Sequence, residues 1–127
     1  LVTILFLFAA WPLLSQADVT ASITSHWSGG FQGEACIDAT VELHGWKITL
    51  TFDPPITSLD AFTANVEEKE DGGKVFELTS KEYNGNEHVG DHLCIGFMGH
   101  SSGDVSPTVT AELEGTDGTV VQPTQSP

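Results

Sequence analysis

Histidines and carboxylates are the residues of this 127-residue chain that could catalyse a reaction or hold a metal ion. Five histidines are spread along the sequence, at His26, His44, His88, His92 and His100. His88 and His92 are four residues apart, but Gly90 and the strand-like surroundings deny them a common helical face. Because no third ligand follows at a defined spacing, we expect no metal site and no cofactor.

Paired acids could hydrolyse a glycosidic bond, but that chemistry needs a cleft and an acid with a raised pKa. The acidic run at residues 67–71 precedes Gly72-Gly73, which is typical of a solvated hairpin end, and it lacks the spacing of a calcium loop. A copper-dependent oxidative polysaccharide enzyme would need a histidine at its mature N-terminus, whereas we expect the mature chain to begin near Asp18. The sequence pairs no nucleophile with a base, so we expect no catalytic residue in this segment.

Three aromatic residues with polar or small neighbours, Trp27, Phe62 and Tyr83, suggest a binding surface instead. They fall on three separate predicted strands or strand edges. Flat rings displayed from several strands of one sheet form a platform that can stack on the faces of sugars. Each ring has a plainer interpretation: Trp27 and Phe62 could be core residues, and Tyr83 a half-buried edge residue.

The first seventeen residues are uncharged and mostly apolar, and they close with Ser15-Gln16-Ala17. The run is short for a membrane span, and its end has the small-x-small pattern of a signal-peptidase site. We interpret residues 1–17 as the remnant of a signal peptide, so that the mature chain begins near Asp18 and is secreted and extracellular. A buried N-terminal helix or a membrane anchor is the alternative.

The net charge of −14, with eighteen acidic and four basic residues, argues against binding to nucleic acid or an anionic membrane. Cys36 and Cys94 are the two cysteines, and in a secreted chain they suggest one disulfide. Free thiols and intermolecular pairing are the alternatives. Strand parity turns both cysteines away from their apolar neighbours.

Alternation of apolar and polar residues predicts the fold. It is clearest at Trp46, Ile48, Leu50 and Phe52, which share one face, so we assign Trp46 to the core. Glycine, proline and asparagine turn signals separate several such runs. The pattern predicts an all-β chain, a two-sheet antiparallel β-sandwich (Ig-like) with seven to nine short strands, over residues 18–115. Residues 116–127 have the Pro, Thr, Ser and Gln composition of a linker or tail.

Five short pieces occur in order along the chain: Trp27-Ser28-Gly29-Gly30-Phe31, Gly45-Trp46, Phe62, Tyr83-Asn84 and Gly96-Phe97-Met98-Gly99. In this order and spacing they resemble carbohydrate-binding module family 2, the bacterial-type cellulose-binding domain, in its invertebrate form. The resemblance covers about residues 19–115. It implies a β-sandwich that binds cellulose, and in some members chitin or xylan, through a flat face with three exposed aromatics.

The resemblance places Trp27, Phe62 and Tyr83 at the three ring positions, and Phe62 and Tyr83 replace the tryptophan that relatives usually carry there. Polar groups beside the rings would bind sugar hydroxyls, and the candidates are Glu34, Asp60 and Asn84. The family's usual disulfide joins the ends of the domain. A bridge between Cys36 and Cys94 would instead cross between strands, beside the binding face.

These features predict a non-catalytic, monomeric module that docks on an insoluble polysaccharide. We expect it to be joined to a C-terminal glycoside hydrolase domain, and a β-1,4-endoglucanase is the first expectation for that domain. A stand-alone acidic matrix protein that binds chitin or calcium mineral is the first alternative. The second is an Ig-like adhesion module whose aromatics contact a protein partner.

Overall fold

The computed structural model describes residues 19–70, 72–103 and 105–115. The predicted signal remnant at residues 1–17 and the predicted linker at 116–127 lie outside the described residues. Across the described ranges, no helix is long and apolar enough to cross a bilayer.

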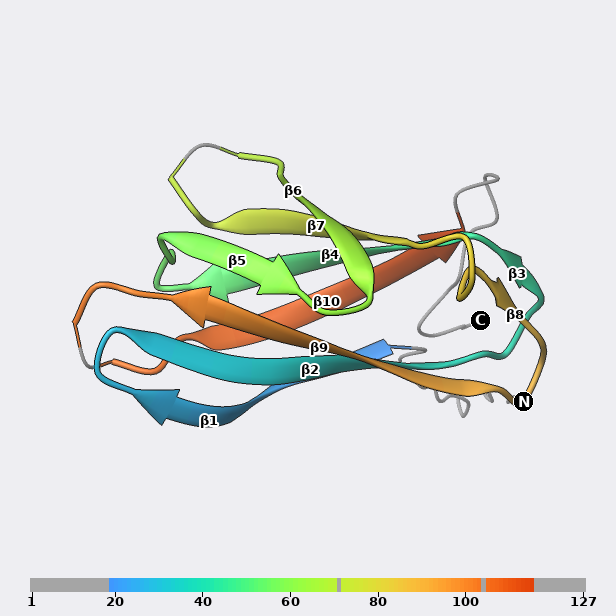
Figure 1. Ribbon diagram of the computed structural model, residues 1–127, viewed down its shortest axis with the longest axis horizontal. Helices are drawn as coiled ribbons and strands as arrows, with labels where there is room; N and C mark the ends of the chain where they lie inside the picture. The colour runs from blue at the N-terminus through green and yellow to red at the C-terminus, as the bar shows by residue number, and fades with distance from the viewer. Residues whose placement is uncertain (1–18, 71, 104, 116–127) are drawn as a thin grey trace, which may run out of the picture.

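Two four-stranded antiparallel sheets pack face to face, which confirms the predicted β-sandwich (Figure 1). The first sheet has the order β1 (Val19–Trp27), β2 (Gly30–Asp38), β9 (His92–His100) and β5 (Ser58–Ala61). The second has the order β10 (Thr108–Gly115), β4 (Trp46–Asp53), β7 (Val75–Ser80) and β6 (Ala64–Glu68). Two short strands of two residues each, β3 (Leu43–His44) and β8 (Asn86–Glu87), pair with each other and belong to neither sheet. The eight strands of the two sheets fall within the predicted range.

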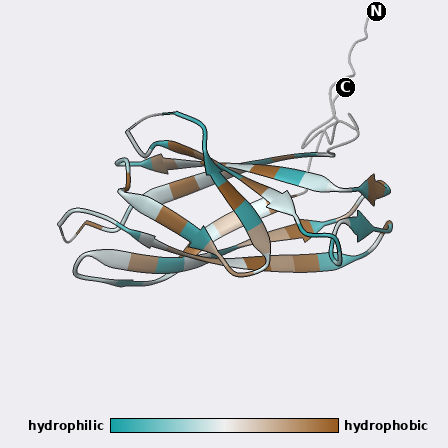
Figure 2. Cartoon of the chain, turned by 45° about the horizontal axis from the view of Figure 1, so that its top comes forward, coloured by the Kyte–Doolittle hydropathy of each residue, from teal (hydrophilic) through white to brown (hydrophobic). Residues whose placement is uncertain are grey.

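The core follows the alternation seen in the sequence, which appears as alternating brown and teal bands along the strands in Figure 2. On β4, every second residue from Trp46 to Phe52 is fully buried. Phe52 stands at the centre of the aromatic packing, with ring centroids 5.7 Å from Phe31, 5.9 Å from Phe76 and 6.1 Å from Phe97. Edge-on and tilted contacts of this kind are the arrangements that aromatic rings favour.

Trp46 is fully buried, as predicted. Its indole nitrogen donates a hydrogen bond of 2.8 Å to the main-chain oxygen of Asn84. The buried N–H therefore has a partner, and the same bond fixes the turn that follows β7.

The surface of the first sheet that faces away from the core is called the outer face below. Its central rows are set by the register of β2 against β9, which places these residues directly opposite one another: Gly30 and His100, Gln32 and Met98, Glu34 and Gly96, Cys36 and Cys94, Asp38 and His92. On either side, β1 and β5 form the edges of this face.

Candidate functional site

The three predicted ring positions are all exposed in the folded chain. The exposed fraction is 42% for Trp27, 59% for Phe62 and 73% for Tyr83. None of the three is therefore a core residue, and the elements that carry them decide whether they can act together.

Trp27 is turned outward by an irregularity in β1. The register of β1 against β2 shifts between Ile23 and Ser25, so that Ile23 pairs with buried Gly33 whereas Trp27 pairs with outward-facing Gly30. Ile23 packs against the core in consequence, and Trp27 lies on the outer face. A regular strand would have given both residues the same face.

The indole of Trp27 lies against Gly30. A methyl group at position 30 would be only 2.6 Å from Nε1 of Trp27 and 3.0 Å from its Cε2. Gly30 is buried although it faces outward, because the indole covers it. The glycine leaves room for the ring to rest close to the sheet.

Phe62 follows β5 directly, and its ring also lies against a glycine of the sheet. Its N–H donates a hydrogen bond of 3.0 Å to the main-chain oxygen of Gly96. Its ring lies against the same glycine, since a methyl group at position 96 would be 2.8 Å from Cδ2 of Phe62. Trp27 and Phe62 thus lie on one sheet, each against an outward-facing glycine.

Tyr83 has a different location from the one expected. It lies in the turn after β7, a strand of the second sheet, so the three rings are not all carried by one sheet. The turn is nevertheless attached to the first sheet's edge, because the side-chain amide of Asn84 donates a hydrogen bond of 2.8 Å to the main-chain oxygen of Thr63. Thr63 is the residue after Phe62.

Asn84 organises that turn. Its side-chain oxygen accepts a hydrogen bond of 2.8 Å from the N–H of Lys81, and its main-chain oxygen accepts the indole N–H of Trp46. The side chain of Asn84 is therefore bonded on both its nitrogen and its oxygen within the protein. It holds Tyr83 next to the Phe62 segment.

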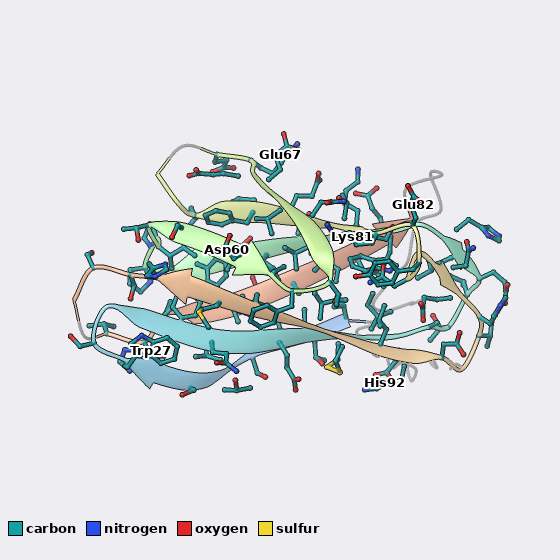
Figure 3. The ribbon with its side chains drawn as sticks, viewed as in Figure 1. Trp27, Asp60, Glu67, Lys81, Glu82 and His92 are labelled. Carbon is teal, nitrogen blue, oxygen red and sulfur yellow. A yellow bond between two sulfur atoms is a disulfide. The ribbon has the colours of Figure 1, made fainter. Side chains whose placement is uncertain are left out.

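The predicted carboxylates lie on the outer face. Glu34 is exposed and stands opposite Gly96, the glycine against which the Phe62 ring lies. Asp60 is exposed on β5, opposite Met98 (Figure 3). Both carboxylates thus flank the surface that carries the two rings.

Two residues that sequence reasoning did not single out lie between the rings. Gln32 and Met98 face each other across β2 and β9, one row from Gly30 and one row from Gly96. Gln32 is exposed and Met98 half-buried. The parity of Gln32 with Glu34 was visible in the sequence, but its position between Trp27 and Phe62 depends on the pairing of β2 with β9.

Cys36 and Cys94 form the predicted disulfide across β2 and β9. His92, two residues before Cys94, lies with Nε2 3.3 Å from Cys94 Sγ, and its Nδ1 lies 2.6 Å from the carboxylate of Asp38. In Figure 3 the disulfide lies beside His92, at the end of the sheet far from Trp27. His88 is elsewhere, with Nδ1 2.9 Å from Glu42, so the two histidines do not share a site.

The Glu42–His88 pair perturbs both ionisations. The hydrogen bond to His88 lowers the pKa of Glu42, and the hydrogen bond from Glu42 raises the pKa of His88. Nearby Glu87 is largely buried, and that burial raises its pKa. These groups lie around the β3–β8 pair, away from the two rings of the outer face.

Residues 17–118 match the sequence model of a family described as a cellulose binding domain. Over 106 residues the chain is 29% identical to endoglucanase A of Thermobispora bispora, which takes in 78% of this chain and 22% of that protein. The chain therefore matches about a fifth of the length of this curated relative.

Solved structures of similar fold include the chitin-binding domain of Chi18aC from Streptomyces coelicolor. That domain superposes with a TM-score of 0.56 at 27% identity, covering 79% of this chain and 91% of the domain. The chitin-binding domain of a hyperthermophilic chitinase from Pyrococcus furiosus has a TM-score of 0.56 over 90% of this chain and all of that domain. At 15% identity, the second likeness concerns the fold alone.

Proposed function

Because the chain belongs to the cellulose-binding domain family, we propose that its outer face docks on an insoluble neutral polysaccharide, cellulose first and chitin second. The module is non-catalytic, and its ligand-binding residues are the aromatic rings and the polar groups beside them. The observation that carries this proposal is the placement of Trp27 and Phe62 on one face, each against a glycine.

The spacing of the two rings suits an extended ligand. The Trp27 ring lies against Gly30 on β2, and the Phe62 ring lies against Gly96 on the neighbouring strand β9. Gly96 is opposite Glu34, so the two glycines are four residues apart along the strands. Strand geometry makes this about 13 Å along the sheet and about 5 Å across it. A sugar chain that runs nearly parallel to β2 would cover both rings, and Gln32 and Met98 would lie beneath it.

The rings supply the affinity and the polar groups supply the orientation. A glucan presents apolar C–H faces, and covering them with an aromatic ring contributes roughly 1.5–3 kcal/mol per ring when fully buried. Glu34 and Asp60 can accept hydrogen bonds from the sugar's hydroxyls along the rim. Carboxylates on this face, within a chain of net charge −14, disfavour an anionic polysaccharide.

Tyr83 extends the surface beyond Phe62, through the turn that Asn84 ties to Thr63. We assign Asn84 a positioning role here, because both polar atoms of its side chain are already hydrogen-bonded within the protein. Its effect on the sugar is exerted through Tyr83.

The biological role that fits this module is targeting in the extracellular space. The relative from Thermobispora bispora is an endoglucanase of which the matched region is a small part, which supports an attached glycoside hydrolase here too. Anchoring would raise the local concentration of such an enzyme on its substrate without any new chemistry. The module itself acts as a monomer in this arrangement and contacts neither nucleic acid nor membrane.

A depletion assay on microcrystalline cellulose, chitin and insoluble xylan tests the proposal. We expect retention on cellulose or chitin that persists in about 1 M NaCl, where the Debye length is about 3 Å and charge contacts are screened. Retention that requires calcium and disappears in salt would favour the alternative of an acidic matrix protein. Absence of retention on all three polymers would contradict the proposal and favour an adhesion module.

A further inference from the structure

We propose that Cys36, Cys94 and His92 form a redox-gated site for a soft metal ion, with Asp38 as the residue that orients His92. In the oxidised protein the two cysteines are joined and the site is closed. In the reduced protein the same three side chains become ligands. This inference goes beyond the proposed polysaccharide binding and does not depend on it.

The register of β2 against β9 assembles the cluster. Cys36 stands opposite Cys94 and Asp38 opposite His92, so two consecutive outward-facing rows hold all four residues. One donor atom from each of Cys36, His92 and Cys94 lies within 4.8 Å of the other two. The side chains of Asp38 and His92 are largely exposed, at 66% and 60%, so an ion can reach the cluster from solvent.

The hydrogen bond to Asp38 leaves the correct nitrogen of His92 available. Nδ1 lies 2.6 Å from the Asp38 carboxylate, which can only accept, so Nδ1 carries the proton. In the neutral ring the free lone pair is then on Nε2, the atom that lies 3.3 Å from Cys94 Sγ. A histidine held by a carboxylate in this way is the usual outer-shell arrangement of protein metal sites.

One ligand separation already agrees with a tetrahedral ion in the oxidised protein, and the two sulfur atoms move apart once the bond between them is reduced. Zinc binds thiolate sulfur at about 2.3 Å and imidazole nitrogen at about 2.0–2.1 Å, so neighbouring ligand atoms lie roughly 3.5 Å apart. The separation of His92 Nε2 from Cys94 Sγ is already close to this value. Two thiolates and one imidazole favour Zn²⁺, Cd²⁺ or Cu⁺ over calcium or magnesium, and water would take the fourth position.

Opening the site requires a reductant, which we take to be a dithiol. It transfers two electrons and two protons to the Cys36–Cys94 bond, yielding two thiols and the cyclic disulfide of the reductant. Binding of a divalent ion then releases the two thiol protons to solvent, because only the thiolates ligate. Thiol–disulfide exchange with an oxidised dithiol reverses the step: the two cysteine thiolates give two electrons to that disulfide, the Cys36–Cys94 bond forms again, and the ion is released because its sulfur ligands are lost.

Cadmium titration of the whole chain tests the proposal, since thiolate-to-cadmium charge transfer absorbs in the ultraviolet. The protein is reduced with a dithiol, freed of reductant without air, and titrated beside its oxidised form. We expect a band that saturates at one equivalent in the reduced protein only, and that weakens when Zn²⁺ is added in large excess. Equal cadmium binding in both forms, without the thiolate band, would mean a general acidic surface effect and would overturn the proposal.

Two variants test whether His92 and Asp38 contribute to metal binding or whether the two thiols alone bind the ion. Asp38→Asn is expected to weaken Cd²⁺ binding by about 10–100-fold, as loss of an outer-shell partner does, and His92→Ala at least as much. His26→Ala removes an exposed histidine of β1 and should leave the titration unchanged. If His92→Ala and His26→Ala behave alike, His92 is no ligand and the proposal fails.

Far-UV circular dichroism accompanies each titration. If reduction alone unfolds the chain, stoichiometric Zn²⁺ should restore the strand signal, because binding to the folded site then drives folding. A reduced chain that stays unfolded with zinc present contradicts the proposal. Cellulose retention of the oxidised Asp38→Asn variant is measured separately. A change in that retention concerns the proposed polysaccharide-binding face and does not affect the test of the metal site.

Discussion

The indole of Trp27 lies against Gly30, the residue directly opposite it in the β1–β2 pair. Any side chain at position 30 must push the ring away, because a methyl group there would approach Nε1 to 2.6 Å. The ring's closeness to the sheet therefore depends on a residue that itself need not touch the ligand.

Gly30→Ala is expected to weaken retention on cellulose by about fivefold, which corresponds to roughly 1 kcal/mol of the contribution of one aromatic ring. Depletion isotherms measure the change. In a Trp27→Ala background the same substitution should have little further effect, since the two residues act through one ring. Full additivity of the two changes would contradict the coupling.

Asn84→Ala should destabilise the fold by about 1–3 kcal/mol, because the N–H of Lys81 and the main-chain oxygen of Thr63 lose their side-chain partner. Urea denaturation followed by tryptophan fluorescence measures the loss. Asn86→Ala, at an exposed position on β8, is the matched control and should have a much smaller effect. Equal effects would show that the turn does not depend on Asn84.

The Glu42–His88 pair should give a small pH-dependent stabilisation. The raised pKa of His88 means that its contribution is complete below about pH 6.5 and is lost as the pH rises through the folded-state pKa. The lowered pKa of Glu42 means that its contribution is present above about pH 4.5 and is lost as the pH falls through the folded-state value. Both groups are charged together between these limits.

Glu42→Gln is therefore expected to lower the melting temperature most between about pH 4.5 and 6.5 and least at pH 8. In an NMR titration, the pKa of His88 should fall towards its ordinary value in this variant. A His88 titration that is identical in both proteins would refute the pairing.

Replacing both cysteines by serine should lower the free energy of unfolding by about 4 kcal/mol, since the bridge joins residues 58 apart in sequence. Urea denaturation of the oxidised wild type and the double variant measures the difference. Because Trp27 and Gly30 lie several rows from the bridge, the variant should still bind cellulose where it remains folded. Unchanged stability would mean that the bridge adds no constraint to the unfolded chain.

The sandwich could be predicted from alternation because the central strands β2 and β4 bury every second residue. From Trp46 to Phe52 the pattern is unbroken, and the structure buries those residues completely. The exposure of Trp27 is a harder case. In a regular strand Trp27 shares the face of Ile23, and only the register shift between Ile23 and Ser25 turns it outward. A single added residue in a strand leaves no reliable mark in a sequence without the partner strand.

The candidate residues of the site could be named from the sequence, but their arrangement could not. Tyr83 belongs to a turn of the second sheet, and its attachment to Thr63 depends on one hydrogen bond of Asn84 that spans 21 residues. Gln32 and His92 acquire their neighbours from the β2–β9 register, which joins segments about sixty residues apart. Local pattern carries no information on such pairing.

The most direct test of the account is retention of Trp27→Ala on microcrystalline cellulose in high salt. Val89→Ala, which shortens another exposed apolar side chain, is the control. We expect Trp27→Ala to bind about tenfold to hundredfold more weakly, from the loss of roughly 1.5–3 kcal/mol of ring contact, while its melting temperature and the binding of Val89→Ala stay at the wild-type level. Wild-type retention by a folded Trp27→Ala protein would contradict the assignment of the outer face.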